Sequence, residues 1–195
     1  MASVTSKDGT TIGYTKTGSG PVLIVVAGAT QFRAFDPSMA VLADLLAPRH
    51  TVITYDRRGR GESSDTQPFA PAREIEDIAA LIEAAGGRAS IIGYSSGSVL
   101  ALEAAVAGLP VDNVIMYEPP FVLPGTGFPP PADYLQSLNR MVAAGDRDGP
   151  PAYFLQSLGM PPEAIDGMKQ SPMWPVMQGI GRTIAYDGQF MFDAY

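Results

Sequence analysis

Residues 90–106 of this 195-residue chain are SIIGYSSGSVLALEAAV, a strand pattern followed by a helix pattern. Residues 90–93 form a short, largely apolar run after a glycine pair, which is typical of a central parallel strand. Residues 99–106 contain no helix breaker and are followed by a glycine and a proline, which predicts a helix and its end. Between them, GYSSG at residues 93–97 is a G-x-S-x-G pattern at a strand-to-helix turn.

Ser95 lies at the apex of this predicted turn and is therefore a candidate nucleophile. A turn this sharp strains the backbone of its apex residue, and Gly93 and Gly97 leave room for the neighbouring segments to approach. The backbone N–H of Ser96, at the helix start, is placed to bind an oxygen that becomes negative during attack. The hydroxyl still needs a base, usually histidine, to take its proton. An ordinary serine in a βα turn is the alternative interpretation.

The composition excludes several classes of function. The chain has no cysteine, so it has neither disulfides nor thiolate metal sites. Its formal net charge of -7 argues against nucleic-acid binding, because neutralising phosphates requires clustered lysine and arginine. Residues 1–9 are polar and no later stretch is long enough to span a bilayer, which predicts a cytoplasmic protein that does not enter membranes.

Strand and helix patterns alternate along the first part of the chain. Strands are expected at residues 11–15, 22–26, 51–55, 90–93 and 114–117. Between them, apolar residues recur at helical spacing over residues 35–46 and 75–85. This alternation predicts an α/β fold, a mostly parallel sheet with helices on both faces.

Four landmarks in the correct order resemble the N-terminal part of an α/β-hydrolase-fold protein, over residues 11–118. Besides GYSSG, the segment YDRRGRGES at residues 55–63 is similar to the family's D-x-R-G-x-G-x-S loop. Ala27 and Gly28 stand where the family usually has His-Gly, and YEPP at residues 117–120 resembles the end of its sixth strand. The similarity is to bacterial serine hydrolases of the esterase kind and to cofactor-free haloperoxidases.

The resemblance implies roles for individual residues. The second oxyanion donor, beside Ser96, would be the backbone N–H of Ala29, which a side-chain change at Ala27 does not remove. Glu118, at the end of a strand, would be the triad acid, or would instead line the pocket or fix the proline turn after it. The substrate would be a small molecule with an ester-like carbonyl, and neither cofactor nor metal would be required.

Two loops near the expected site carry charge. The arginines of the 55–63 loop lie among acidic residues and glycines, which favours bracing of the active-site rim over substrate binding. Gln31 and Arg33 follow Ala29 and would either reach the pocket or be solvated.

The base of the triad is the difficulty. In this family the order along the chain is nucleophile, acid, histidine, and no histidine follows Ser95. The single histidine, His50, precedes the predicted strand at residues 51–55 and is therefore expected at the sheet edge opposite Ser95. The histidine, and with it the usual acid, are missing, so this chain alone is expected to have little or no triad-dependent activity.

The sequence changes character after residue 118. Residues 1–118 form the predicted core, and residues 119–195 are predicted to form a helical cap that begins with a proline-rich connection at 119–131. Helices are expected at residues 134–144, 152–158, 162–169 and 174–192.

The strand at 114–117 is apolar in consecutive positions and is the last one, which predicts a sheet incomplete at its C-terminal edge. The chain is therefore expected to be a fragment, or to have a continuation that is disordered, cleaved or supplied by another chain.

The leading hypothesis is a serine hydrolase acting through Ser95. The alternative is a non-catalytic ligand-binding or scaffold protein that retains the fold, as the lack of a histidine after Ser95 favours. A haloperoxidase or a carbon–carbon hydrolase would use the same triad and stays open.

Overall fold

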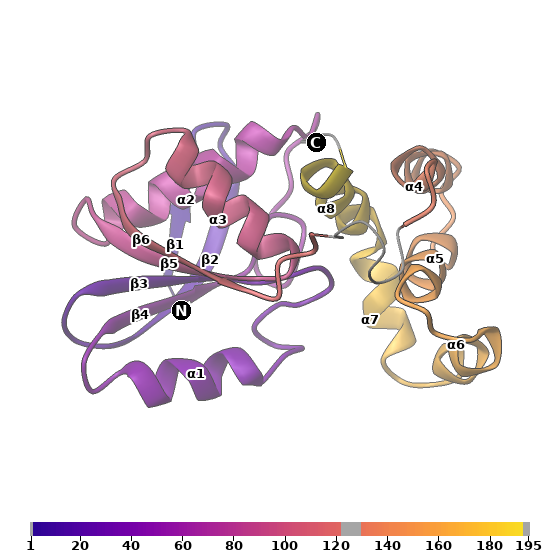
Figure 1. The fold of residues 1–195 in the computed structure, drawn as a ribbon, viewed down its shortest axis with the longest axis horizontal. Coiled ribbons are helices and arrows are strands. Elements are labelled where there is room, and N and C mark those ends of the chain that lie inside the picture. Colours follow the sequence, from indigo (N-terminus) through magenta and orange to yellow (C-terminus); the bar gives the residue numbers. More distant parts are fainter. Residues whose placement is uncertain (1, 122–129, 193–195) are drawn as a thin grey trace. The chain divides into compact units, whose positions relative to one another are not determined.

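The computed structural model describes residues 2–121 and 130–192, with backbone only at Phe192, so most of the predicted proline-rich connection lies outside the described residues. The chain divides into two compact units, residues 1–120 and 121–195. The elements of the first unit are β1 (Ala2–Thr5), β2 (Thr11–Gly18), β3 (Val22–Val26), α1 (Ser38–Leu46), β4 (Thr51–Tyr55), α2 (Pro71–Ala84), β5 (Ala89–Tyr94), α3 (Ser96–Val106) and β6 (Val111–Tyr117) (Figure 1).

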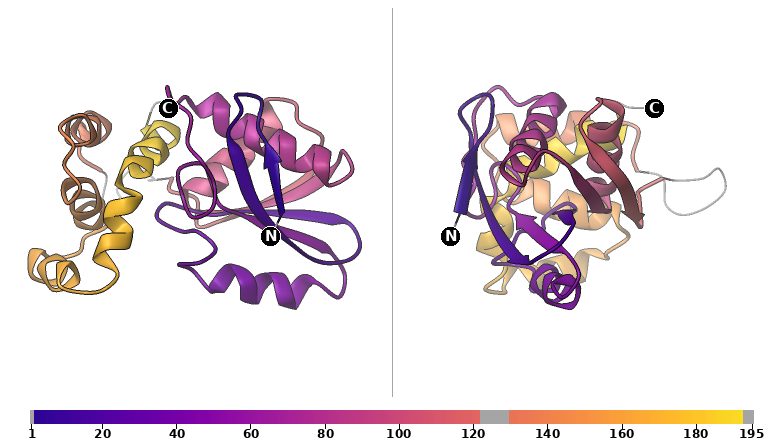
Figure 2. Two further views of the ribbon diagram at one scale, coloured as in Figure 1. Left: turned by 180° about the vertical axis from the view of Figure 1, so that it is seen from behind. Right: turned by 90° about the vertical axis from the view of Figure 1, so that its left-hand side faces the viewer.

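The first unit is built on one six-stranded sheet, in the order β1-β2-β4-β3-β5-β6. β4, β3, β5 and β6 run parallel, which confirms the predicted mostly parallel sheet. The β1–β2 hairpin, drawn in indigo in Figure 2, joins β4 antiparallel at one end. Because the parallel strands share a direction, β3, β5 and β6 all end at the same sheet edge, the one formed by the carboxyl ends of the strands.

Helices cover both faces of this sheet, as the alternation predicts. In Figure 1, α1 lies on one face and α2 and α3 lie on the other. Met39 and Ala43 of α1 pack with Val25 and Val52 of the central strands in one buried cluster. The alternate strand residues face α2 and α3, since successive side chains of a strand point to opposite faces.

β6 is the outermost strand on its side of the sheet. It pairs with β5, in a register that places Ile115 beside Ile92 and Tyr117 beside Tyr94. Ile92 and Tyr94 belong to the α1 face, where Ile115 and Tyr117 are 48% and 54% exposed. No other strand among residues 2–121 and 130–192 pairs with β6, so it presents apolar side chains beside an open backbone edge.

The second unit consists of short helices. They are α4 (Tyr134–Ala143), α5 (Gly149–Ser157), α6 (Pro162–Lys169), α7 (Trp174–Gly179) and α8 (Gly181–Phe192). α4 and α8 pack through a buried cluster that contains Tyr134, Leu138 and Ile184. Gly188 allows their close approach, because a Cβ there would lie 3.1 Å from Leu135 Cδ1.

The predicted continuous helix over residues 174–192 is wrong. It is two helices, α7 and α8, separated at Ile180, whose backbone has φ -103° and ψ 5°. Gly179 and Gly181 flank this residue, and glycine lowers helix propensity enough to favour a break. Within the described residues, no helix has the length and apolar character needed to cross a membrane.

Candidate active site

Ser95 occupies the apex of the turn between β5 and α3. Its backbone has φ 48° and ψ -122°, a conformation that costs a non-glycine residue of the order of 1–3 kcal/mol. An alanine-like Cβ at Gly93 would overlap the carbonyl of Gly97, and one at Gly97 would overlap the carbonyl of Val26. The two glycines of the GYSSG pattern are therefore required by the close packing of β3, β5 and α3.

Hydrogen bonds to β6 hold the strained turn in place. The Ser95 N–H donates to the Tyr117 carbonyl at 2.9 Å. The Ser98 hydroxyl donates to the Gly93 carbonyl at 2.6 Å and also lies 3.2 Å from the Tyr117 carbonyl. Ser95 is exposed at the end of the sheet, while Ser96, the first residue of α3, is fully buried. Ser95 is thus accessible on a rigid support.

The loop after β3 runs directly beside Ser95. A Cβ placed on Gly28 would lie 3.2 Å from Ser95 Cβ and 2.9 Å from the Tyr94 carbonyl oxygen. Ala29 follows, and its N–H has no hydrogen-bond partner among the described residues. Thr30 has φ 64°, so the backbone bends sharply after Ala29. The predicted second donor therefore lies in the loop that passes beside Ser95, and its N–H has no partner within residues 2–121 and 130–192.

Polar side chains surround the Gly28 peptide groups. The Gly28 N–H donates to Gln31 Oε1 at 2.8 Å, and Gln31 Nε2 donates to Asp36 Oδ2 at 2.5 Å. Burial opposes ionisation of Asp36, but hydrogen bonds from Ser38 and Gln31 outweigh it and lower the pKa of its carboxyl. Arg60 Nη1 donates to the Gly28 carbonyl at 2.7 Å.

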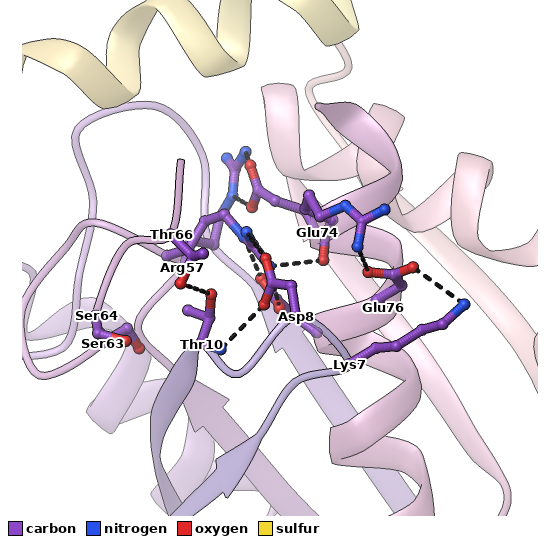
Figure 3. Close-up of polar contacts among 12 residues, drawn as sticks. Lys7, Asp8, Thr10, Arg57, Ser63, Ser64, Thr66, Glu74 and Glu76 are labelled. Carbon is purple, nitrogen blue, oxygen red and sulfur yellow. Dashed lines mark hydrogen bonds and ion pairs between the residues drawn. The ribbon is translucent and has the colours of Figure 1, made fainter. Parts of the chain in front are cut away.

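The arginines of the 55–63 loop are buried and act as braces. Arg57 makes two hydrogen bonds with Glu74, at 2.6 and 2.7 Å, and also donates to the Ala27 carbonyl at 3.2 Å. Figure 3 shows the Arg57–Glu74 pair linking the loop to α2. Arg58 likewise donates two hydrogen bonds to Asp77 of α2. These contacts agree with the expectation of a scaffold loop.

Gln31 and Arg33 both make specific hydrogen bonds or ion pairs in the loops near Ser95. Gln31 folds back onto the Gly28 N–H, and Arg33 Nη2 forms ion pairs with Asp56 at 3.0 Å and Glu62 at 2.6 Å. Gln31 is held by neighbours within its own loop, whereas Arg33 is held by acidic residues that come within reach only on folding. Neither is a simple solvated loop residue.

Glu118 directly follows Tyr117, whose strand partner Tyr94 directly precedes Ser95. It is exposed, has φ 47°, and makes no ion pair within the described part of the chain. Thr30, Ser95 and Glu118 are the non-glycine residues with positive φ there, and each follows one of three adjacent strands. Backbone strain therefore gathers at one sheet edge, as it does at many functional sites.

His50 lies on the other side of the sheet from this edge. It directly precedes β4, and Thr51 at the start of β4 pairs with Val22 at the start of β3. Five residues of β4 separate His50 from the edge where Ser95 lies, roughly 16 Å at the rise of a strand. The geometry agrees with the expectation that His50 does not serve Ser95.

A mostly parallel sheet with a serine at a strained strand-to-helix turn is typical of α/β hydrolases, and comparisons with known proteins give the same family. Residues 23–192 match the model of the alpha/beta hydrolase family. An alpha/beta hydrolase from Sphaerobacter thermophilus is 46% identical, with a TM-score of 0.86, over 98% of this chain and 74% of that chain. The chain belongs to the alpha/beta hydrolase family.

More distant structures share the fold. A hydrolase from Pseudomonas aeruginosa is 20% identical, with a TM-score of 0.72, over 98% of this chain and 72% of that one. A thermophilic esterase from Thermogutta terrifontis is also 20% identical, with a TM-score of 0.68, over 96% of this chain and 72% of that one.

Proposed function

We propose that Ser95 is the nucleophile of a serine hydrolase that acts on small molecules with an ester-like carbonyl. The observation that carries this proposal is the exposed Ser95 at a strained apex, next to a loop whose Ala29 N–H has no partner among the described residues. Strain of this kind persists only where the surrounding structure enforces it. The esterase from Thermogutta terrifontis, which shares the fold, is compatible with this substrate class.

The proposed reaction follows from these groups. Ser95 Oγ bonds to the carbonyl carbon while its proton passes to a base, and the carbonyl oxygen becomes negative. The N–H groups of Ser96 and Ala29 stabilise that oxygen. The bond to the leaving alcohol breaks as the base returns the proton to it. Water then attacks the acyl-enzyme by the same route, releasing the acid and restoring Ser95.

We propose that the base comes from outside this chain's described residues. The position of His50 before the start of β4, at the opposite end of the strands from Ser95, supports this proposal. The open edge of β6 and the exposed Ile115 and Tyr117 fit a further strand and an apolar covering segment, from a continuation of the chain or a second polypeptide. That segment would carry the histidine. On this proposal the 195 residues alone have little activity.

Glu118 is proposed as the acid candidate that this chain offers. Its support is its place beside Ser95, its positive φ and its lack of an ion pair among the described residues. Lining the pocket or fixing the turn before the prolines are the alternatives. The helices of the second unit are proposed as a cap that shapes the substrate pocket, because the chain leaves β6 at the edge that carries Ser95.

Chemical rescue tests the nucleophile. A fluorophosphonate probe is added to the chain with and without imidazole, which stands in for the missing histidine, and labelled peptides are measured by mass spectrometry. We expect imidazole to accelerate labelling of Ser95. The Ser95→Ala variant should not be labelled, whereas Ser90→Ala, which removes a hydroxyl near the start of β5, should be.

The opposite result would favour the alternative function. If Ser95 stays unlabelled at every imidazole concentration while the protein is folded, the site has no nucleophile. The chain would then be a ligand-binding or scaffold protein that retains the fold, as its single histidine at the wrong edge suggests.

A further inference from the structure

The peptide group between Gly28 and Ala29 is held at its carbonyl end by a buried charge. Arg60 Nη1 lies 2.7 Å from the Gly28 oxygen, and the Arg60 side chain is only 2% exposed. Hydrogen bonds from a guanidinium are stronger than those between neutral groups, and low exposure strengthens them further. The orientation of this carbonyl is therefore fixed by a residue that lies 32 positions away in the chain.

Fixing that carbonyl also fixes the donor of Ala29. The Gly28 C=O and the Ala29 N–H belong to one planar trans peptide group, so they point in opposite directions. With the carbonyl on Arg60, the N–H points away from the guanidinium. The positive charge also polarises the peptide, which makes its N–H a better donor, since hydrogen bonds in a chain strengthen one another.

The preceding peptide group is held from its other end. The Gly28 N–H is occupied by Gln31 Oε1 at 2.8 Å. The Gln31 amide has a defined orientation, because its NH₂ group donates to Asp36, a carboxylate that can only accept. Gly28 N–H is thus not available to an oxyanion, whereas Ala29 N–H has no partner among the described residues.

We propose that Arg60 and Gln31 are positioning residues that together clamp the Gly28 peptides, so that Ala29 and not Gly28 supplies the loop's oxyanion donor. Neither side chain touches the reacting atoms; each acts through the backbone. Ala27 carries no polar side-chain atom that could hold this turn, so the bracing comes from outside it. The inference rests on the proposed function of Ser95.

The clamp is tested first without chemistry. The amide ¹⁵N and ¹H resonances of Gly28 and Ala29, and their hydrogen exchange, are compared between the wild type and Arg60→Met. In Arg60→Met we expect both Ala29 resonances to shift and the exchange of its amide to change. In Arg60→Lys, which keeps the positive charge, the resonances and the exchange should stay much closer to those of the wild type. Arg33→Met is the matched control, since the Arg33 side chain bonds to Thr15, Asp56 and Glu62 and, among the described residues, has no hydrogen bond to the Gly28 peptides.

The consequence is tested by the rate of fluorophosphonate labelling at Ser95 in imidazole. We expect Arg60→Met to lower the maximal rate constant about ten-fold, part of the effect of losing one oxyanion donor, without changing the half-saturating imidazole concentration. Unfolding alone would lower the labelled fraction, not the rate constant. If Arg60→Met does not fold, Gln31→Met serves instead and should free the Gly28 amide to exchange and lower the same rate constant.

The outcomes separate the inference from the proposed function. Unchanged Ala29 resonances and an unchanged labelling rate in a folded Arg60→Met variant would overturn the clamp, and so would an unchanged Gly28 amide in Gln31→Met. Absence of any labelling in the wild type would refute the role of Ser95, while the resonances of Ala29 would still show whether the clamp exists.

Discussion

Replacing Gly28 by alanine adds only a methyl group, yet it should displace the loop beside Ser95 and destabilise the fold. Gly28 has no positive φ, so the backbone itself accepts alanine, and the effect comes from crowding alone. The new Cβ would lie 2.9 Å from both the Tyr94 carbonyl oxygen and Gln31 Oε1, and 3.2 Å from Ser95 Cβ. The Tyr94 oxygen is backbone at the end of β5 and cannot yield, so Gln31 and the loop must move.

The cost follows from these contacts. Overpacking of a rigid site costs about 1–3 kcal/mol, and losing the Gly28–Gln31 hydrogen bond adds about 1 kcal/mol. The free energy of unfolding should therefore fall by about 2–4 kcal/mol. Urea unfolding should be followed by far-UV circular dichroism, because the only tryptophan, Trp174, reports on the second unit.

A matched glycine separates crowding from backbone strain. Gly9 has φ 87° and open space around its Cβ position, so Gly9→Ala should cost only about 1–2 kcal/mol, from the left-handed backbone. The reasoning is refuted if Gly28→Ala is no more destabilising than Gly9→Ala, or if it leaves the labelling of Ser95 unchanged.

Two further predictions concern the acid response and the missing base. Burial opposes ionisation of Asp8, but hydrogen bonds from Arg58 and Thr10 outweigh it and lower its pKa to about 2. Asp8→Asn should therefore reduce the free energy of unfolding by up to about 2 kcal/mol at pH 7, and urea curves should show this difference shrinking as the pH falls from about 4 to about 2. For the base, native mass spectrometry of the purified protein should show a mass above the 20.6 kDa of this chain, because a histidine-containing segment is also present. That segment should accelerate Ser95 labelling as imidazole does. A lone 20.6 kDa species would count against that segment.

The sequence predicted those parts of the fold that depend on local patterns. Residues 22–26 and 51–55 were expected as strands and form β3 and β4, and the turn at Ser95 has the expected strained backbone. Apolar runs and glycine spacing suffice for these, because burial and steric room act on neighbouring residues. The break at Ile180 was missed, since two flanking glycines weaken a helix without always ending it.

The position of Ser95, its glycines and the sheet that carries it were therefore determined by the sequence itself. Only the tertiary structure showed that Thr30, Ser95 and Glu118 share one strained edge. It alone placed Arg60 on the Gly28 carbonyl. The physical reason is that every residue has a backbone carbonyl, so the sequence does not indicate which one a side chain will hydrogen-bond. Such a contact forms only when packing brings distant segments together, and here it holds the peptide group that we propose as an oxyanion donor.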